Sequence, residues 1–111
     1  MNETTIFKEA FGDSPVIKVL DFLLEGRNLD YSMTDIAENA NIGWTTLHRI
    51  WANLINFELV KHTRDIGKAK LFKLNQENPV VKELIKIYDM LLIQQTEKTL
   101  SQKLSKKLIA H

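Results

Sequence analysis

The sequence predicts a mainly α-helical fold with one small β-hairpin, an α+β class, that ends in a long helix. Apolar residues recur at spacings of three and four in five segments, which is the period of amphipathic helices. Between residues 60 and 74 the spacing changes to two on either side of Gly67, which is typical of two strands joined by a turn. The 32 residues after Pro79 contain no glycine or proline, so we expect one continuous helix there.

The first two helices are predicted within the N-terminal quarter of the chain. Four apolar residues near the start are spaced by one, three or four positions: Ile6, Phe7, Ala10 and Phe11. They predict an N-terminal arm or short helix over residues 1–13, which lies on the body or on a partner subunit. Ser14 followed by Pro15 is the pattern of an N-cap with proline at the first helical position. This second helix is expected to end near Gly26.

Two further helices follow with a short break between them. A polar link over residues 30–32 ends in Ser32, a natural N-cap for a helix over residues 33–40. Asn41 then suits the left-handed backbone that a tight helix exit needs. The next helix is expected over residues 44–57, and its buried side is predicted to carry Leu47, Ile50, Trp51 and Leu54.

The hairpin is predicted from alternation along its first strand. Val60, His62 and Arg64 alternate with Lys61 and Thr63, so the first three are expected on one face. A turn around Gly67 leads into a returning strand over residues 69–74.

Charge is unevenly distributed along the chain. Residues 1–60 carry four Lys/Arg against nine Asp/Glu, whereas residues 61–73 carry five against one. A basic stripe on an acidic chain indicates one localised anionic partner. The alternative is a solvated hairpin whose lysines keep its edges from aggregating.

The residues at the corner between the third and fourth helices have a spacing that resembles a known motif. Four residues follow Ala37 at distances of four, five, ten and thirteen positions: Asn41, Ile42, Leu47 and Ile50. With these residues the chain resembles the helix-turn-helix of prokaryotic transcriptional regulators, most like the ArsR-like and MarR-like winged-helix families of archaea and bacteria, and we expect an archaeal source. The stretch FELVKHTRDIGKAKLFKLN is similar to the wing of these families. Asn41 departs from their usual glycine.

The resemblance covers about residues 14–92 and implies a function for each part. It implies a winged helix-turn-helix DNA-binding domain over residues 14–78; the helix over residues 79–111 is predicted, from its apolar band, to be a C-terminal dimerisation helix. The helix over residues 44–56 would be the recognition helix in the DNA major groove. Its outward face holds the candidate contacts Trp44, Thr45, Thr46, His48, Arg49 and Asn53.

The chemistry of these residues suits base recognition. Arg49 can pair bidentately with guanine and Asn53 with adenine. The alternative is that they form an ordinary polar surface, with Trp44 covering the helix junction. The resemblance places the hairpin on the DNA backbone or in the minor groove, through the basic residues Arg64, Lys68 and Lys70.

The last helix carries an apolar band that is too wide for a lone helix on a small body. Its predicted dimerisation residues are Leu84, Ile87, Tyr88, Leu91, Leu100 and Leu104. We expect a homodimer with two recognition helices about 34–36 Å apart. The alternative is that the band packs back onto residues 6–24.

The sequence therefore predicts a sequence-specific transcriptional regulator that binds double-stranded DNA as a homodimer. Without cysteine, and with three scattered histidines, the chain has no zinc-ligand spacing, and we expect no metal and no cofactor. No catalytic constellation or phosphate loop is recognisable, so we expect no enzyme. The lack of a long apolar run or signal peptide predicts a cytoplasmic protein without a membrane partner.

Two alternatives share the same fold. One is a winged-helix protein–protein interaction module that does not bind DNA, which the modest pI of about 8.0 favours. The other is a replication or partition factor that acts on plasmid or viral DNA.

Overall fold

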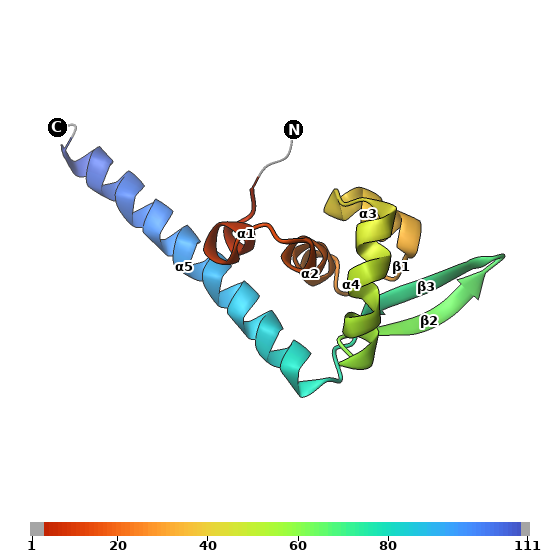
Figure 1. Cartoon of the computed structure of the whole chain (residues 1–111). Coiled ribbons are helices and arrows are strands. Elements are labelled where there is room, and N and C mark those ends of the chain that lie inside the picture. The colour runs from red at the N-terminus through yellow and green to blue at the C-terminus, as the bar shows by residue number, and fades with distance from the viewer. Residues whose placement is uncertain (1–3, 110–111) are drawn as a thin grey trace.

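The structure is a computed structural model that describes residues 4–109 of the 111-residue chain, with side chains as far as Lys107. The helices are α1 (Ile6–Phe11), α2 (Pro15–Glu25), α3 (Met33–Ala40), α4 (Trp44–Asn56) and α5 (Pro79–Ile109). The strands are β1 (Tyr31–Ser32), β2 (Val60–Ile66) and β3 (Ala69–Leu74). Figure 1 shows α2, α3 and α4 beside the sheet and α1 against α5, which runs past them. The predicted α+β class with a long C-terminal helix is confirmed.

Local capping explains where the first helices begin. The side chain of Ser14 accepts a hydrogen bond from the Ile17 amide at the start of α2. At the start of α3, Ser32 accepts from the Asp35 amide at 3.1 Å, and Asp35 accepts from the Ser32 amide in return. This reciprocal arrangement is a capping box, which satisfies two amides that the helix itself cannot pair. Asn41 ends α3 with a φ of 58°, so its predicted left-handed conformation is confirmed.

The hydrophobic core lies where α2, α3, α4, the sheet and the start of α5 meet. Its fully buried side chains include Leu24, Ile36, Leu47 and Leu74. Trp51 is buried as predicted, and its ring meets the ring of Phe72 edge-on at 5.2 Å between centroids. This packing fixes α4 against both α2 and the hairpin.

The sheet has three antiparallel strands in the order β1-β3-β2, not two. The predicted hairpin is confirmed as β2 and β3. The polar link predicted over residues 30–32 contains β1, in which Tyr31 pairs with Phe72 and Ser32 with Leu71. A strand of two residues is too short to show an alternating pattern, so only the pairing with β3 reveals it.

A β-bulge changes which face Arg64 occupies. His62 pairs with Phe72 but Arg64 pairs with Leu71, so Thr63 is an extra residue on β2. Cross-strand partners share a face of the sheet, and a shift of one residue moves a side chain to the opposite face. The prediction that Arg64 lies on the same face as Val60 and His62 is therefore wrong.

The two halves of α5 have different environments. In the first half, Val81 and Tyr88 are buried, and the Tyr88 ring lies 5.7 Å from the ring of Phe7 in α1. After Leu91 every described side chain of α5 is exposed. In Figure 1 the second half extends beyond the body, and the described chain measures 62 × 31 × 23 Å. Packing against the N-terminal helices thus accounts for the first half of the apolar band only.

Candidate nucleic-acid interface

The helix α4 presents a polar face opposite its buried one. Leu47, Trp51 and Leu54 point into the core. The predicted contact residues Thr45, His48, Arg49 and Asn53 are exposed, and Thr46 is half-buried. The helical spacing that buries one set of side chains therefore leaves the other set available to a ligand, as the sequence predicted.

The first turn of α4 is open. Gly43 is its N-cap residue and supplies no side-chain hydrogen bond, whereas Thr5, Ser14 and Ser32 cap the first three helices. Among the described residues, no side chain accepts a hydrogen bond from the amides at this end, and a helix N-terminus of this kind favours an anion.

Trp44 stands at the edge of this exposed face. Half of its surface is exposed, at 51%, and its ring meets the ring of His48 edge-on with centroids 4.4 Å apart. The two aromatic rings belong to successive turns of α4, so they form one exposed aromatic cluster.

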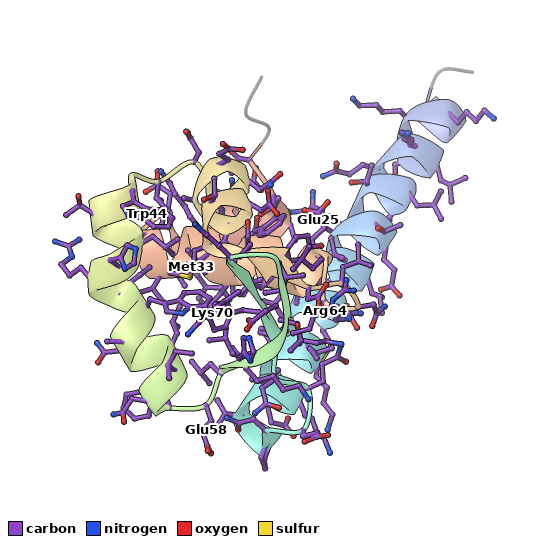
Figure 2. All side chains as sticks on the ribbon, turned by 90° about the vertical axis from the view of Figure 1, so that its right-hand side faces the viewer. Glu25, Met33, Trp44, Glu58, Arg64 and Lys70 are labelled. Atoms are coloured by element: carbon purple, nitrogen blue, oxygen red, sulfur yellow. The ribbon has the colours of Figure 1, made fainter. Side chains whose placement is uncertain are left out.

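A groove separates α4 from the hairpin. It has a volume of about 420 Å³, and its walls include Trp44 and His48 from α4 and Lys68 and Lys70 from the hairpin. Its apolar lining comes from residues of α3, α4 and β3: Met33, Trp51, Ala69 and Phe72. Figure 2 shows Lys70 between the hairpin and α4, and Trp44 at the N-terminal end of α4. We call this feature the α4–β3 groove; none of its lining residues is acidic.

Arg64 does not share this location with the two lysines. Figure 2 shows it on the other side of the hairpin from Lys70. Its guanidinium donates to Asp30 through Nε at 2.9 Å and through Nη2 at 3.2 Å, and Thr63 donates its hydroxyl to Asp30 at 2.6 Å. The three predicted hairpin residues are therefore divided between two faces, because of the bulge at Thr63.

The bonds to Asp30 shift the protonation equilibria of both partners. Hydrogen bonds from Arg64 and then from Thr63 stabilise the charged carboxylate and lower the pKa of Asp30 from 3.8 to about 2. The same pairing raises the pKa of Arg64. The sequence reading missed Asp30 because it lies 34 positions before Arg64 and no local pattern connects the two.

His62 lies beside one potential metal ligand, the carboxylate of Asp65. It makes a hydrogen bond to Asp65 at 2.7 Å, and its ring lies 5.6 Å from the ring of Phe72. Within the described residues, no set of three or more His, Asp or Glu side chains is arranged to hold a metal ion.

The predicted dimerisation residues also divide into two groups. Tyr88 is 6% exposed and belongs to the core of the protomer, and Leu84 and Leu91 are half-buried against that core. Tyr88 is thus placed inside one chain rather than on a free surface, because α1 covers it. Ile87, Leu100 and Leu104 remain exposed.

Five exposed apolar residues of α5 form a stripe that is interrupted by the exposed side chain of Glu97. It consists of five side chains spaced by three, four or seven positions: Ile87, Met90, Ile93, Leu100 and Leu104. At 100° per residue this stripe lies on the side of α5 opposite Val81 and Tyr88, which face the body. We call it the α5 stripe.

No helix in the described part of the chain combines the length and apolar character that crossing a membrane requires.

Comparisons with known proteins agree on the fold. No protein-family model matches the chain, and no curated protein matches its sequence. Solved structures do match. The chain has a winged helix-turn-helix fold. A double mutant of ZitR from Lactococcus lactis in its apo form shares 19% identity, covers 92% of this chain and 83% of its own, and gives a TM-score of 0.61.

Two other winged helix-turn-helix structures match over similar lengths. MepR, a transcription regulator of the Staphylococcus aureus efflux pump MepA, shares 20% identity over 83% of this chain and 74% of its own, at a TM-score of 0.55. The homodimeric DNA-binding domain of Mb0332 from Mycobacterium bovis, a possible ArsR-family regulator, shares 18% identity over 84% of this chain and 81% of its own, at a TM-score of 0.56. Identities this low establish a shared architecture and nothing finer.

Proposed function

We propose that this protein is a transcriptional regulator that binds specific sites in double-stranded DNA as a homodimer. In this proposal α4 enters the major groove, and the β2–β3 hairpin, the wing, contacts the adjacent backbone or minor groove. The observation that carries the proposal is the combination of an exposed polar face on α4 with two wing lysines across the α4–β3 groove.

The dimensions of α4 suit this role. Its 13 residues span about 20 Å, and its diameter matches a major groove about 12 Å wide. Arg49 and Asn53 are one turn apart on the exposed face, so they can address neighbouring base pairs. Arg49 would read guanine and Asn53 adenine, while Thr45 and the open first turn of α4 would receive a phosphate.

The remaining predicted contacts lie around this centre. Trp44 and His48 would contact sugar or backbone at the margin, and half-buried Thr46 would contribute its hydroxyl. Lys68 and Lys70 would replace condensed counterions on the flanking backbone. Arg64 faces the other way and is bound to Asp30, so we assign it no direct contact.

The α5 stripe supports a dimer, because five exposed apolar side chains on one helix face are costly to leave in water. A twofold pairing of this helix would present two copies of α4 to a palindromic site. The solved relatives are consistent with this proposal, since Mb0332 is described as homodimeric and a mutant of ZitR has been solved in complex with DNA. A cytoplasmic location without catalytic activity belongs to the same proposal. The archaeal source and the choice between ArsR-like and MarR-like kinship stay predictions.

Selection of bound fragments from random duplex DNA tests the proposal. We expect a palindromic consensus with half-sites about one helical turn apart. On that duplex, Arg49→Ala should weaken binding by about 1–3 kcal/mol and relax specificity at one position in each half-site.

The wing is tested by titrating salt against duplex binding. The double variant Lys68→Ala/Lys70→Ala should weaken binding to all sequences and reduce the salt dependence by about one unit of slope for each lost phosphate contact. The matched control is Lys106→Ala/Lys107→Ala at the end of α5, which removes the same charge away from the groove and should leave the slope unchanged. Failure of the natural sequence to bind any duplex at low salt would instead support the protein–protein interaction module.

A further inference from the structure

Asp30 makes contacts that the proposed DNA-binding function does not yet explain. It precedes β1, which lies at one edge of the sheet, yet its carboxylate binds Thr63 and Arg64 on β2, at the other edge. It accepts three hydrogen bonds from these two residues, at 2.6, 2.9 and 3.2 Å. The side chain of Asp30 therefore connects the two edges across β3.

The bulge in β2 is what makes this connection possible. Thr63 is the extra residue of the bulge, and Arg64 is the first residue after it. The shift in register turns Arg64 to the face of Leu71, where Asp30 reaches it. Regular pairing would have left Arg64 on the face of His62, away from Asp30.

The outer part of the wing has few other attachments to the body. Every side chain from His62 to Ile66 is exposed. Among the described residues, the side-chain hydrogen bonds that join residues 62–66 to any part of the chain outside the hairpin all go to Asp30. Beyond the pairing of β2 with β3, Asp30 is therefore the main polar restraint on this strand.

The backbone at Asp30 is held in place by contacts of the two residues that follow it. The next residue, Tyr31, packs its ring against Phe22 at 4.6 Å between centroids and donates its hydroxyl to the carbonyl of Gly26 at 3.1 Å. Gly26 leaves room for that hydroxyl, because a Cβ at this position would clash with it. Ser32 follows and caps α3, so Asp30 is tied to the helix that packs beside α4.

We propose that Asp30 is a positioning residue of the DNA interface, which holds the wing at a fixed angle to α4 through Thr63 and Arg64. This inference rests on the proposed DNA-binding function. Lys68 lies in the turn just beyond Ile66, which is two residues along β2 from Arg64, so it is roughly 7–8 Å further toward the hairpin tip. A tilt of about 15° at Arg64 would displace Lys68 by about 2 Å, which is enough to break a phosphate contact of 2.7–3.2 Å. Arg64 thus acts through Asp30 and not by contacting DNA.

The variant Asp30→Ala separates this positioning role from a purely electrostatic effect, because the two predict opposite changes in DNA affinity. Removal of a carboxylate next to a bound anion should strengthen binding if charge alone mattered. Loss of the positioning contact should weaken it, by about tenfold, with a lower salt slope as the wing lysines lose their phosphates. Glu38→Ala on α3 is the matched control, since it removes the same charge from an exposed residue without an ion pair among the described residues, and it should not weaken binding.

The reversed pair Asp30→Arg/Arg64→Asp tests whether Arg64 acts through residue 30. It rebuilds the ion pair with the charges exchanged, so it should recover most of the affinity lost in Asp30→Ala. Equal or tighter binding by Asp30→Ala, or no recovery in the reversed pair, would overturn the proposal.

Amide hydrogen exchange of residues 62–70 gives a readout that does not depend on DNA. We expect faster exchange in Asp30→Ala, and natural rates in Glu38→Ala and in the reversed pair. If the natural sequence bound no duplex, the proposed function would fail, and exchange in the wing would still decide whether Asp30 positions it. Unchanged exchange in Asp30→Ala would refute the positioning role in either case.

Discussion

The α5 stripe gives a prediction whose magnitude follows from exposed surface. We consider the double variant Leu100→Glu/Leu104→Glu, which places two charges in the second half of the helix. Leu100 and Leu104 expose 58% and 55% of their surface in one chain. Complete burial of a leucine stabilises by about 1.5–3 kcal/mol, so covering the exposed part of each of these two contributes about 0.8–1.7 kcal/mol.

A twofold dimer contains four such side chains, so their loss should cost about 3–7 kcal/mol of dimerisation free energy. A tenfold change in the dissociation constant corresponds to about 1.4 kcal/mol, and the expected weakening is therefore about two to five powers of ten. Repulsion between the new carboxylates adds to this loss. The protomer should stay folded, because neither side chain belongs to the core.

Analytical ultracentrifugation over a range of concentrations measures this change directly. The control variant is Gln95→Glu/Gln102→Glu, which adds two charges to the same half of α5. These positions lie at least about 140° around the helix from Leu100 and Leu104, so the control should remain dimeric. A dimer of undiminished stability in Leu100→Glu/Leu104→Glu, or a natural protein that is monomeric at micromolar concentration, would refute the reasoning.

Three further predictions concern stability. Phe7→Ala should lower the free energy of unfolding by about 3–5 kcal/mol in chemical denaturation, because Phe7 is buried between α1 and α5, whereas Phe11→Ala, on the same helix but half exposed, should cost less than about 1 kcal/mol. Because the pKa of Asp30 is lowered to about 2, the contribution of its charged form to the free energy of unfolding should be complete above pH 3.8, its ordinary pKa, and should be lost as the pH falls through about 2. Asp30→Asn should remove that part of the acid dependence of the melting temperature. Glu58→Gly should raise the free energy of unfolding by about 0.5–1 kcal/mol, because Glu58 has a φ of 57° that glycine adopts without strain; a destabilised variant would contradict this.

The features that the sequence predicted well are those encoded within one or two helical turns. Ser14 and Ser32 cap amides three residues away, so the information needed to place α2 and α3 is local. The left-handed turn at Asn41 is likewise a property of one residue and its neighbours. The same holds for the polar face of α4, since the spacing of Leu47, Trp51 and Leu54 defines the opposite face.

The candidate site was predicted less completely than the fold. Lys68 and Lys70 were predicted as wing contacts because they are basic residues near the hairpin tip, and in the structure both line the α4–β3 groove. Arg64 was predicted with them as a basic residue near the tip, but the bulge at Thr63 turns it to the other face of the hairpin. The bulge depends on the pairing of β2 with β3, which no pattern within β2 records.

Sequence patterns alone were enough to predict the class of the fold, the order of its helices and hairpin and the exposed face of α4, because periodicity and capping act between residues close together in the chain. Only the tertiary structure decided that Tyr88 belongs to the protomer core, that β1 joins the sheet and that Asp30 holds Arg64 away from α4. Each of these depends on segments that are distant in sequence and meet only when the core has formed. The direction in which a side chain points then depends on what packs beside it.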